Sequence, residues 1–173
     1  MDIYSKVTDE ILAIVNIEEP ILRSLSEDVI TTRFNHQNRS IKMLLGHLVD
    51  SASNNQQRMV RLQYAPRVGH CIPDGERGLL VFPDYTQDND LWIHLQDYQR
   101  EDWDTLVSLW KFFNLHVAHI INAVDRTKLS SYWLDYEGHQ VTLNDMILGY
   151  TDHLRLHIGQ IHELMEIDIN TLG

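Results

Sequence analysis

The chain has 173 residues, 43% of them hydrophobic and 23% charged, which suits one globular domain spanning residues 1–173. Its net charge of −11 argues against nucleic acid and against an anionic membrane surface as partners, because both are bound by clustered Lys and Arg. A single cysteine, Cys71, excludes an internal disulfide and a cysteine-rich zinc site. No apolar run reaches the roughly 18 residues of a spanning helix, and no signal peptide is recognisable, so we expect a cytoplasmic protein.

Apolar residues at helical spacing predict four long helices. They cover about residues 4–25, 40–59, 103–124 and 142–167. Ser40 and Thr142 are good N-caps for the second and fourth helices. Pro20 is expected to bend or restart the first helix, because an interior proline loses a hydrogen bond. The fold class that follows is all-α, a four-helix bundle.

Two connections between these helices are unusual. The stretch 64–90 holds three of the four prolines and is predicted to be a long loop, a kind of segment that is often functional in a compact domain. Residues 131–141 alternate around Glu137-Gly138 and predict a short hairpin before the last helix. The long loop could cover a site and select its substrate.

Histidines on the buried sides of two predicted helices are the main candidates for chemistry. Successive helical residues rotate by about 100°, which places His153, His157 and Gln160 along one edge of the apolar face of the last helix. The same rotation directs His162 towards water. His47 flanks the apolar stripe of the second helix. We therefore select His47, His153 and His157, with His116 in reserve.

Three converging imidazoles would form an open metal site. Side chains four residues apart on a helix lie side by side, so one ion can bridge His153 and His157. Three protein ligands leave a position for water or substrate, as in catalytic zinc sites. The competing interpretation is a pair of half-buried histidines that are hydrogen-bonded within the bundle. Gln160 would be an amide that supports a ligand or contacts the substrate, or simply a solvated side chain.

Other chemistries have less support from the sequence. There is no His-Glu-x-x-His, no Glu-x-x-His, and no glycine-rich nucleotide loop. His70-Cys71 could reach a metal, but a surface thiol is the simpler interpretation. No carboxylate is singled out by its spacing as a general base.

Three segments resemble signatures of the DinB/YfiT-like family. They are SIKMLLGHLVDS at 40–51, DYQREDW at 97–103 and YTDHLRLHIGQI at 150–161. The resemblance implies a four-helix bundle with an unusual connection order, often a homodimer. It also implies a divalent metal, nickel or zinc, on His47, His153 and His157. One departure is Asn38-Arg39, which stands where the family often has Lys-Trp.

The resemblance implies metal-dependent hydrolysis for some relatives and transfer of a low-molecular-weight thiol for others. Our interpretation is a metal-dependent enzyme of one of these two kinds, acting on a small-molecule substrate that could itself be such a thiol. The alternative is a non-enzymatic bundle, a binding or dimerising protein with a vestigial metal site. The two differ in whether the native protein carries stoichiometric metal.

Overall fold

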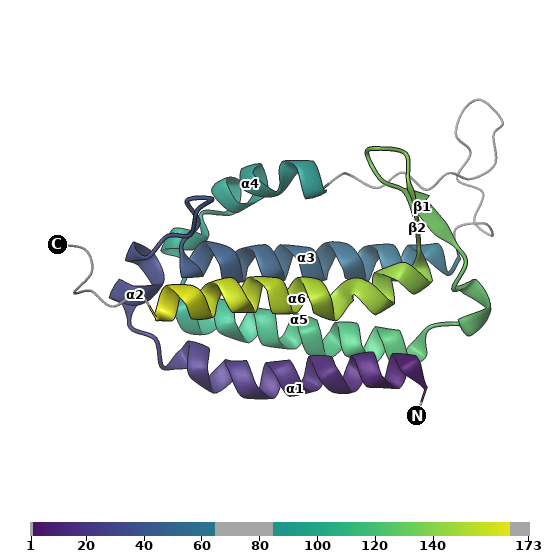
Figure 1. The fold of residues 1–173 in the computed structure, drawn as a ribbon, viewed down its shortest axis with the longest axis horizontal. Helices are drawn as coiled ribbons and strands as arrows, with labels where there is room; N and C mark the ends of the chain where they lie inside the picture. The colour runs from purple at the N-terminus through teal and green to yellow at the C-terminus, as the bar shows by residue number, and fades with distance from the viewer. Residues whose placement is uncertain (1, 65–84, 167–173) are drawn as a thin grey trace.

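Four long helices lie side by side in the computed structural model, which describes residues 2–64 and 85–166 (Figure 1). They are α1 (Ile3–Arg23), α3 (Ile41–Leu62), α5 (Trp103–Ala123) and α6 (Leu143–Met165). The predicted four-helix bundle is confirmed. None of the helices in the described ranges is long and apolar enough to cross a membrane.

The order of the helices around the bundle differs from their order along the chain. Helix α1 packs against α5 and α6, and α3 packs against the same two helices from the other side. Consecutive long helices α1 and α3 therefore lie on a diagonal. Helices α3 and α6 run in opposite directions along their shared contact (Figure 1). This contact is where the second and last predicted helices bring their histidines together.

Both predicted N-caps are confirmed. Ser40 Oγ accepts a hydrogen bond from Met43 N at 3.3 Å, and Thr142 Oγ1 accepts one from Asp145 N at 3.0 Å. Each bond satisfies an amide that the first helical turn leaves without a partner. The caps therefore set where α3 and α6 begin.

The first helix does not restart at Pro20, one of the two outcomes predicted for this residue. Helix α1 continues unbroken through Pro20 and stops three residues later, at Arg23. The ring fixes φ near the helical value, so the helix can pass through it at the cost of one hydrogen bond. The chain then forms a short helix, α2 (Glu27–Thr32), capped by Ser26, which the periodicity did not predict.

The predicted hairpin is confirmed. Strands β1 (Tyr132–Leu134) and β2 (Gln140–Thr142) pair antiparallel, with Trp133 opposite Val141. Gly138 has φ of +85° in the connecting turn, a conformation that favours glycine. Strand β2 leads directly into the N-cap of α6.

Residues 65–84 of the predicted loop 64–90 lie outside the described residues, and the prediction is wrong for residues 85–90. Residues from Tyr85 onward form helix α4 (Tyr85–Gln96), which lies along α3 on the side away from α1 (Figure 1). Leu91 and Leu95 are spaced by four but are exposed, whereas the buried residues are Tyr85 and Ile93, so no single amphipathic face marks this helix in the sequence. The 3-10 helix η1 (Tyr98–Arg100) follows it, and a second, η2 (Arg126–Lys128), precedes the hairpin.

A close contact joins η1 to α3. A Cβ atom placed on Gly46 would lie 2.2 Å from the ring of Tyr98, so only glycine leaves room for that ring. The ring is buried, and its hydroxyl reaches further along α3, to Asp50. This contact places η1 beside the part of α3 that carries His47.

Candidate metal site

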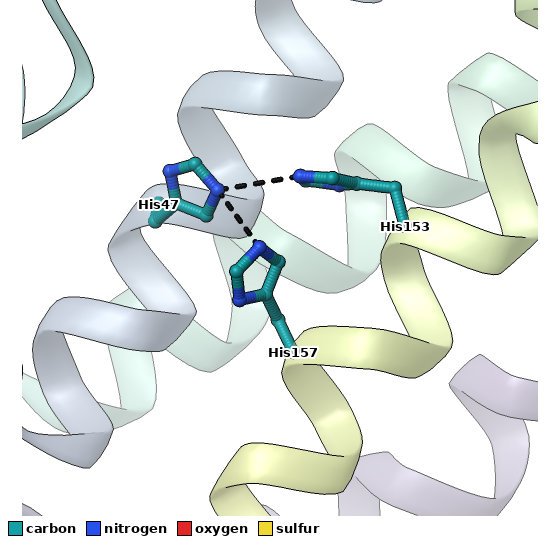
Figure 2. Close-up of side chains that lie close together, drawn as sticks. All are labelled: His47, His153 and His157. Atoms are coloured by element: carbon teal, nitrogen blue, oxygen red, sulfur yellow. Dashed lines mark hydrogen bonds between the residues drawn. The ribbon is translucent and has the colours of Figure 1, made fainter. Parts of the chain in front are cut away.

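The three selected histidines converge where α3 faces α6. His47 Nε2 lies 3.3 Å from His153 Nε2 and 3.1 Å from His157 Nε2 (Figure 2). His47 and His157 are almost fully buried, with 3% and 6% of their surface exposed, and His153 is half-buried. The structure thus brings together all three residues that helical rotation selected, although His47 is more than a hundred residues from the other two.

The spacing of these nitrogen atoms suits a shared metal ion. Two imidazoles on a tetrahedral Zn²⁺, each with a bond of about 2.0–2.1 Å, place their nitrogens about 3.3 Å apart. The two Nε2 separations of 3.3 and 3.1 Å are close to this value. Imidazole nitrogen is a ligand for zinc and nickel alike, so the donor set fits a divalent ion of this group.

The second nitrogen of each ring has an oxygen partner. Nδ1 of His47 lies 2.7 Å from the hydroxyl of Tyr85, and Nδ1 of His157 lies 2.9 Å from Oε1 of Gln160. Nδ1 of His153 lies 3.4 Å from Oγ of Ser51. An imidazole that binds metal through Nε2 carries its proton on Nδ1, and an acceptor there holds the ring in place. Gln160 therefore contacts a ligand candidate, one of the roles expected for it.

The environment keeps the three imidazoles neutral. Burial, with smaller contributions from the neighbouring histidines and Arg39, lowers the pKa of His47 to about 2. Burial and His157 lower the pKa of His153 to about 4, and burial also lowers the pKa of His157. Neutral imidazole is the form that binds metal, so protons do not compete for these nitrogens near pH 7.

A buried carboxylate lies behind His47. Asp50, about one turn further along α3, accepts hydrogen bonds from the Tyr98 hydroxyl at 2.6 Å and from Gln96 Nε2 at 2.7 Å. The Tyr85 hydroxyl lies 3.5 Å from its other oxygen. Burial raises the pKa of Asp50, while these three hydrogen bonds act in the opposite direction. Burial beside this carboxylate likewise raises the pKa of both tyrosines.

The remaining histidine candidates lie apart from this cluster. His116 and His119 are exposed on α5 and stack on each other, so the reserve candidate does not join the site. The prediction that His162 faces water is only partly right. His162 is half-buried, and its Nε2 lies 2.7 Å from Oε2 of Glu18 on α1. His70 and Cys71 lie outside the described residues.

A cavity of about 460 Å³ opens beside the three histidines. Its walls come from α3, α6, the start of α4, the hairpin and the loop before α3. Its polar lining includes Ser51, Asn54, Arg39 and Arg58. Asp145 is the one carboxylate among the described lining residues, and it is held by Thr142 in the N-terminal cap of α6. The cavity is large enough for a small molecule that reaches the Nε2 atoms.

Comparison with known families gives the same assignment as the fold. Residues 19–161 match the model of the DinB superfamily, which is most of the chain. The chain belongs to the DinB superfamily. The three signature segments that suggested this family all lie within the matched range.

A solved structure shares the DinB bundle. The chain is similar to YfiT from Bacillus subtilis, described as a probable metal-dependent hydrolase with an unusual four-helix bundle topology. The two have a TM-score of 0.69 and 17% sequence identity, over 93% of this chain and 83% of YfiT. At this identity the likeness establishes the fold. No curated protein matches the chain by sequence.

Sequence reasoning missed the residues that support the ligands. Tyr85 falls in the predicted loop, although it is 6% exposed and touches His47. Asp50 is three residues after His47 and so lies on the same side of the helix. This spacing is the one local pattern that could have identified it. Its partners Gln96 and Tyr98 come from a segment whose position only the tertiary fold determines.

Proposed function

We propose that His47, His153 and His157 hold one divalent metal ion, zinc or nickel, and that this DinB protein is a hydrolase of a small molecule. The observation that carries the proposal is the convergence of three Nε2 atoms while each Nδ1 atom has an oxygen partner. Buried imidazoles are usually hydrogen-bonded, so the Nδ1 contacts alone would not indicate a metal. With the proton on Nδ1, the Nε2 atoms face one another with their lone pairs, an arrangement that favours a cation between them. The description of YfiT as a probable metal-dependent hydrolase also supports this proposal.

A metal ion on three imidazoles supplies a Lewis acid that polarises a carbonyl and lowers the pKa of water. The residues of the chain position this chemistry. Tyr85 and Gln160 fix the orientation of two rings, and Asp50 in turn accepts hydrogen bonds from the tyrosines around it. The cavity walls on α3 and α6 hold the substrate against the Nε2 atoms.

Metal analysis of the native protein tests the metal site directly. We expect about one zinc or nickel ion per chain, because three imidazoles with an open position form a complete catalytic ligand set. The double variant His153→Ala/His157→Ala should lose the metal and the rise in Tm on adding Zn²⁺, since only a ligand that binds the folded state raises Tm. The matched control is His116→Ala/His119→Ala, which removes two exposed histidines and should keep both properties.

Hydrolysis is tested on the same proteins with a panel of small esters, amides and lactones. Turnover that depends on added metal and disappears in His153→Ala/His157→Ala would support a hydrolase. Stoichiometric metal without turnover of any of these would favour a thiol transferase or a vestigial site. Metal retained in the double variant would refute the ligand assignment.

A further inference from the structure

Arg39 lies in the wall of the cavity that the three histidines share. Its side chain is only 6% exposed, although the guanidinium is always charged near neutral pH. A buried charge is costly unless it is paired. In the sequence Arg39 belongs to the pair that departs from the DinB pattern, and the proposed metal site gives it no role.

The backbone around Arg39 is rigidly built. Asn35 Oδ1 accepts hydrogen bonds from the backbone N–H groups of Gln37 and Arg39, both at 3.0 Å. Asn35 N donates to Arg39 O at 3.0 Å, and Asn38 adopts a left-handed φ of 59° that asparagine tolerates. This tight loop leads into the N-cap of α3, so the direction of the Arg39 side chain is set by the start of the helix that carries His47.

The guanidinium is held along one edge only. Nε and Nη2 donate to Oδ1 of Asp90, and Nη2 also donates to Oδ1 of Asn89 at 2.9 Å. Nη1 donates to no residue in the described part of the chain, so its two N–H groups have no partner there, in a residue that lines the cavity. The planar group is thus pre-oriented by α4, with one nitrogen available.

The positive charge reaches the histidine cluster. The carboxylate of Asp90 is 80% exposed and solvated, so it offsets the charge of Arg39 only in part. Arg39 lines the same cavity as His47 and His157, so its charge lies beside the candidate metal site. In a chain of net charge −11, a fixed cation beside the candidate metal site is the feature that would attract a negative ligand.

We propose that Nη1 of Arg39 binds an oxyanion group of the substrate, a carboxylate or a phosphate, in the cavity beside the three histidines. The substrate class of the site is then a small anionic molecule. This assignment rests on the hydrolase proposal for its substrate, but the binding contact itself requires only the guanidinium and the cavity. A charge-assisted hydrogen bond of this kind orients the ligand as well as attracting it.

The test is an anion titration of the full chain, carried out on metal-free and on zinc-loaded protein. The probes are acetate and inorganic phosphate, added in place of chloride at constant ionic strength. The readout is the ¹H–¹⁵N resonance of the Arg39 Nε–H group together with the affinity. We expect saturable shifts with at least one probe in the metal-free protein. This measurement of anion binding therefore does not depend on metal binding.

Two substitutions separate anion binding from a purely structural role. Arg39→Gln should weaken the affinity by about 10- to 100-fold, the effect of losing a hydrogen bond to a charged group. Asp90→Asn should strengthen it by about twofold to tenfold, because it removes the charge that competes with the anion. A role confined to anchoring α4 predicts that both substitutions act in the same direction. Matched controls are Arg100→Gln and Asp97→Asn, which break an exposed ion pair of 3.2 Å outside the cavity.

Each outcome either supports or overturns the proposal. Opposite changes in Arg39→Gln and Asp90→Asn, with both controls unchanged, support it. No saturable shift in either form of the wild-type protein, or equal losses in both variants, overturns it. If Arg39→Gln fails to fold, the wild-type titration and the direction of the change in Asp90→Asn still distinguish anion binding from a structural role. If the protein binds the anions but never binds metal, the result supports anion binding by Arg39 and contradicts the metal-dependent hydrolase.

Discussion

The hydroxyl of Tyr85, at the first residue of α4, lies 2.7 Å from Nδ1 of His47 on α3. It also lies 3.3 Å from the carbonyl oxygen of His47. One side chain therefore contacts both the ring and the backbone of a proposed metal ligand. This contact links α4, which contributes no proposed ligand, to the geometry of the site.

Tyr85→Phe should weaken metal binding while leaving the fold intact. The substitution keeps the ring but removes the acceptor for Nδ1 of His47, so the imidazole is less firmly oriented. Loss of such a partner typically costs about 10- to 100-fold in metal affinity. Competition with a chelator of known affinity measures the change. Tyr136→Phe, on an exposed tyrosine of the hairpin, is the control, and an equal loss there would contradict the assignment.

The metal-free protein should become less stable as the pH falls from about 6.5 towards 4. The folded-state pKa is about 2 for His47 and about 4 for His153, against 6.5 when unfolded. The unfolded chain therefore binds more protons in this window, and the free energy of unfolding rises with pH across it. Asp50, whose pKa is raised, opposes the trend in the acid part of the window.

Urea unfolding at several pH values, with a chelator present, measures this dependence. His153→Ala/His157→Ala should flatten the slope between pH 6.5 and 4.5, because two of the responsible groups are gone. The control His116→Ala/His119→Ala should keep the wild-type slope, since both of these rings are exposed. A slope that is unchanged in the first variant would show that these imidazoles are not held neutral in the folded protein.

Gly46→Ala should destabilise the protein by about 1–3 kcal/mol, the usual cost of forcing extra atoms into a packed contact. The new Cβ would lie 2.2 Å from the Tyr98 ring, which has to move away from α3. The comparison is Gly159→Ala on α6, where a Cβ meets nothing within 4 Å and should stabilise the helix by about 0.5–1 kcal/mol. Chemical denaturation measures the free energy of unfolding of both variants and so distinguishes the expected loss from the expected gain. An unchanged free energy of unfolding in Gly46→Ala would mean that Tyr98 repacks freely.

Asp50→Asn should lower both stability and metal affinity. An amide in place of the carboxylate keeps one acceptor oxygen for Tyr98 and Gln96, which both donate to Oδ1 of Asp50. It presents an N–H₂ group to the hydroxyl of Tyr85, which lies 3.5 Å from the other oxygen. Leaving buried polar groups without partners costs about 1–3 kcal/mol. The expected readouts are a lower Tm without metal and weaker Zn²⁺ binding. Asp152→Asn, on an exposed face of α6, should alter neither.

Local patterns were enough to predict the four long helices and the three histidines. Helical rotation depends only on spacing, and the N-caps Ser40 and Thr142 set where the rotation starts. Helix α4 and Asp50 could not be found in this way. The importance of Asp50 comes from residues 35 to 48 positions away, brought to it by the packing of α4 and η1 on α3. The prediction for His162 is only partly right, because its side chain is 39% exposed but also contacts Glu18 on another helix.

None of the described residues that line the cavity comes from α1 or α5. The three histidines and the rest of the lining belong to α3, α4, α6, the hairpin and the loop before α3. Half of the bundle therefore supports this cavity without lining it, so fluorophores, affinity tags or stabilising surface substitutions on its outer faces would stay away from the proposed chemistry. For an engineer, α1 and α5 are the places to modify this protein, and α3 and α6 are the places to change what it binds.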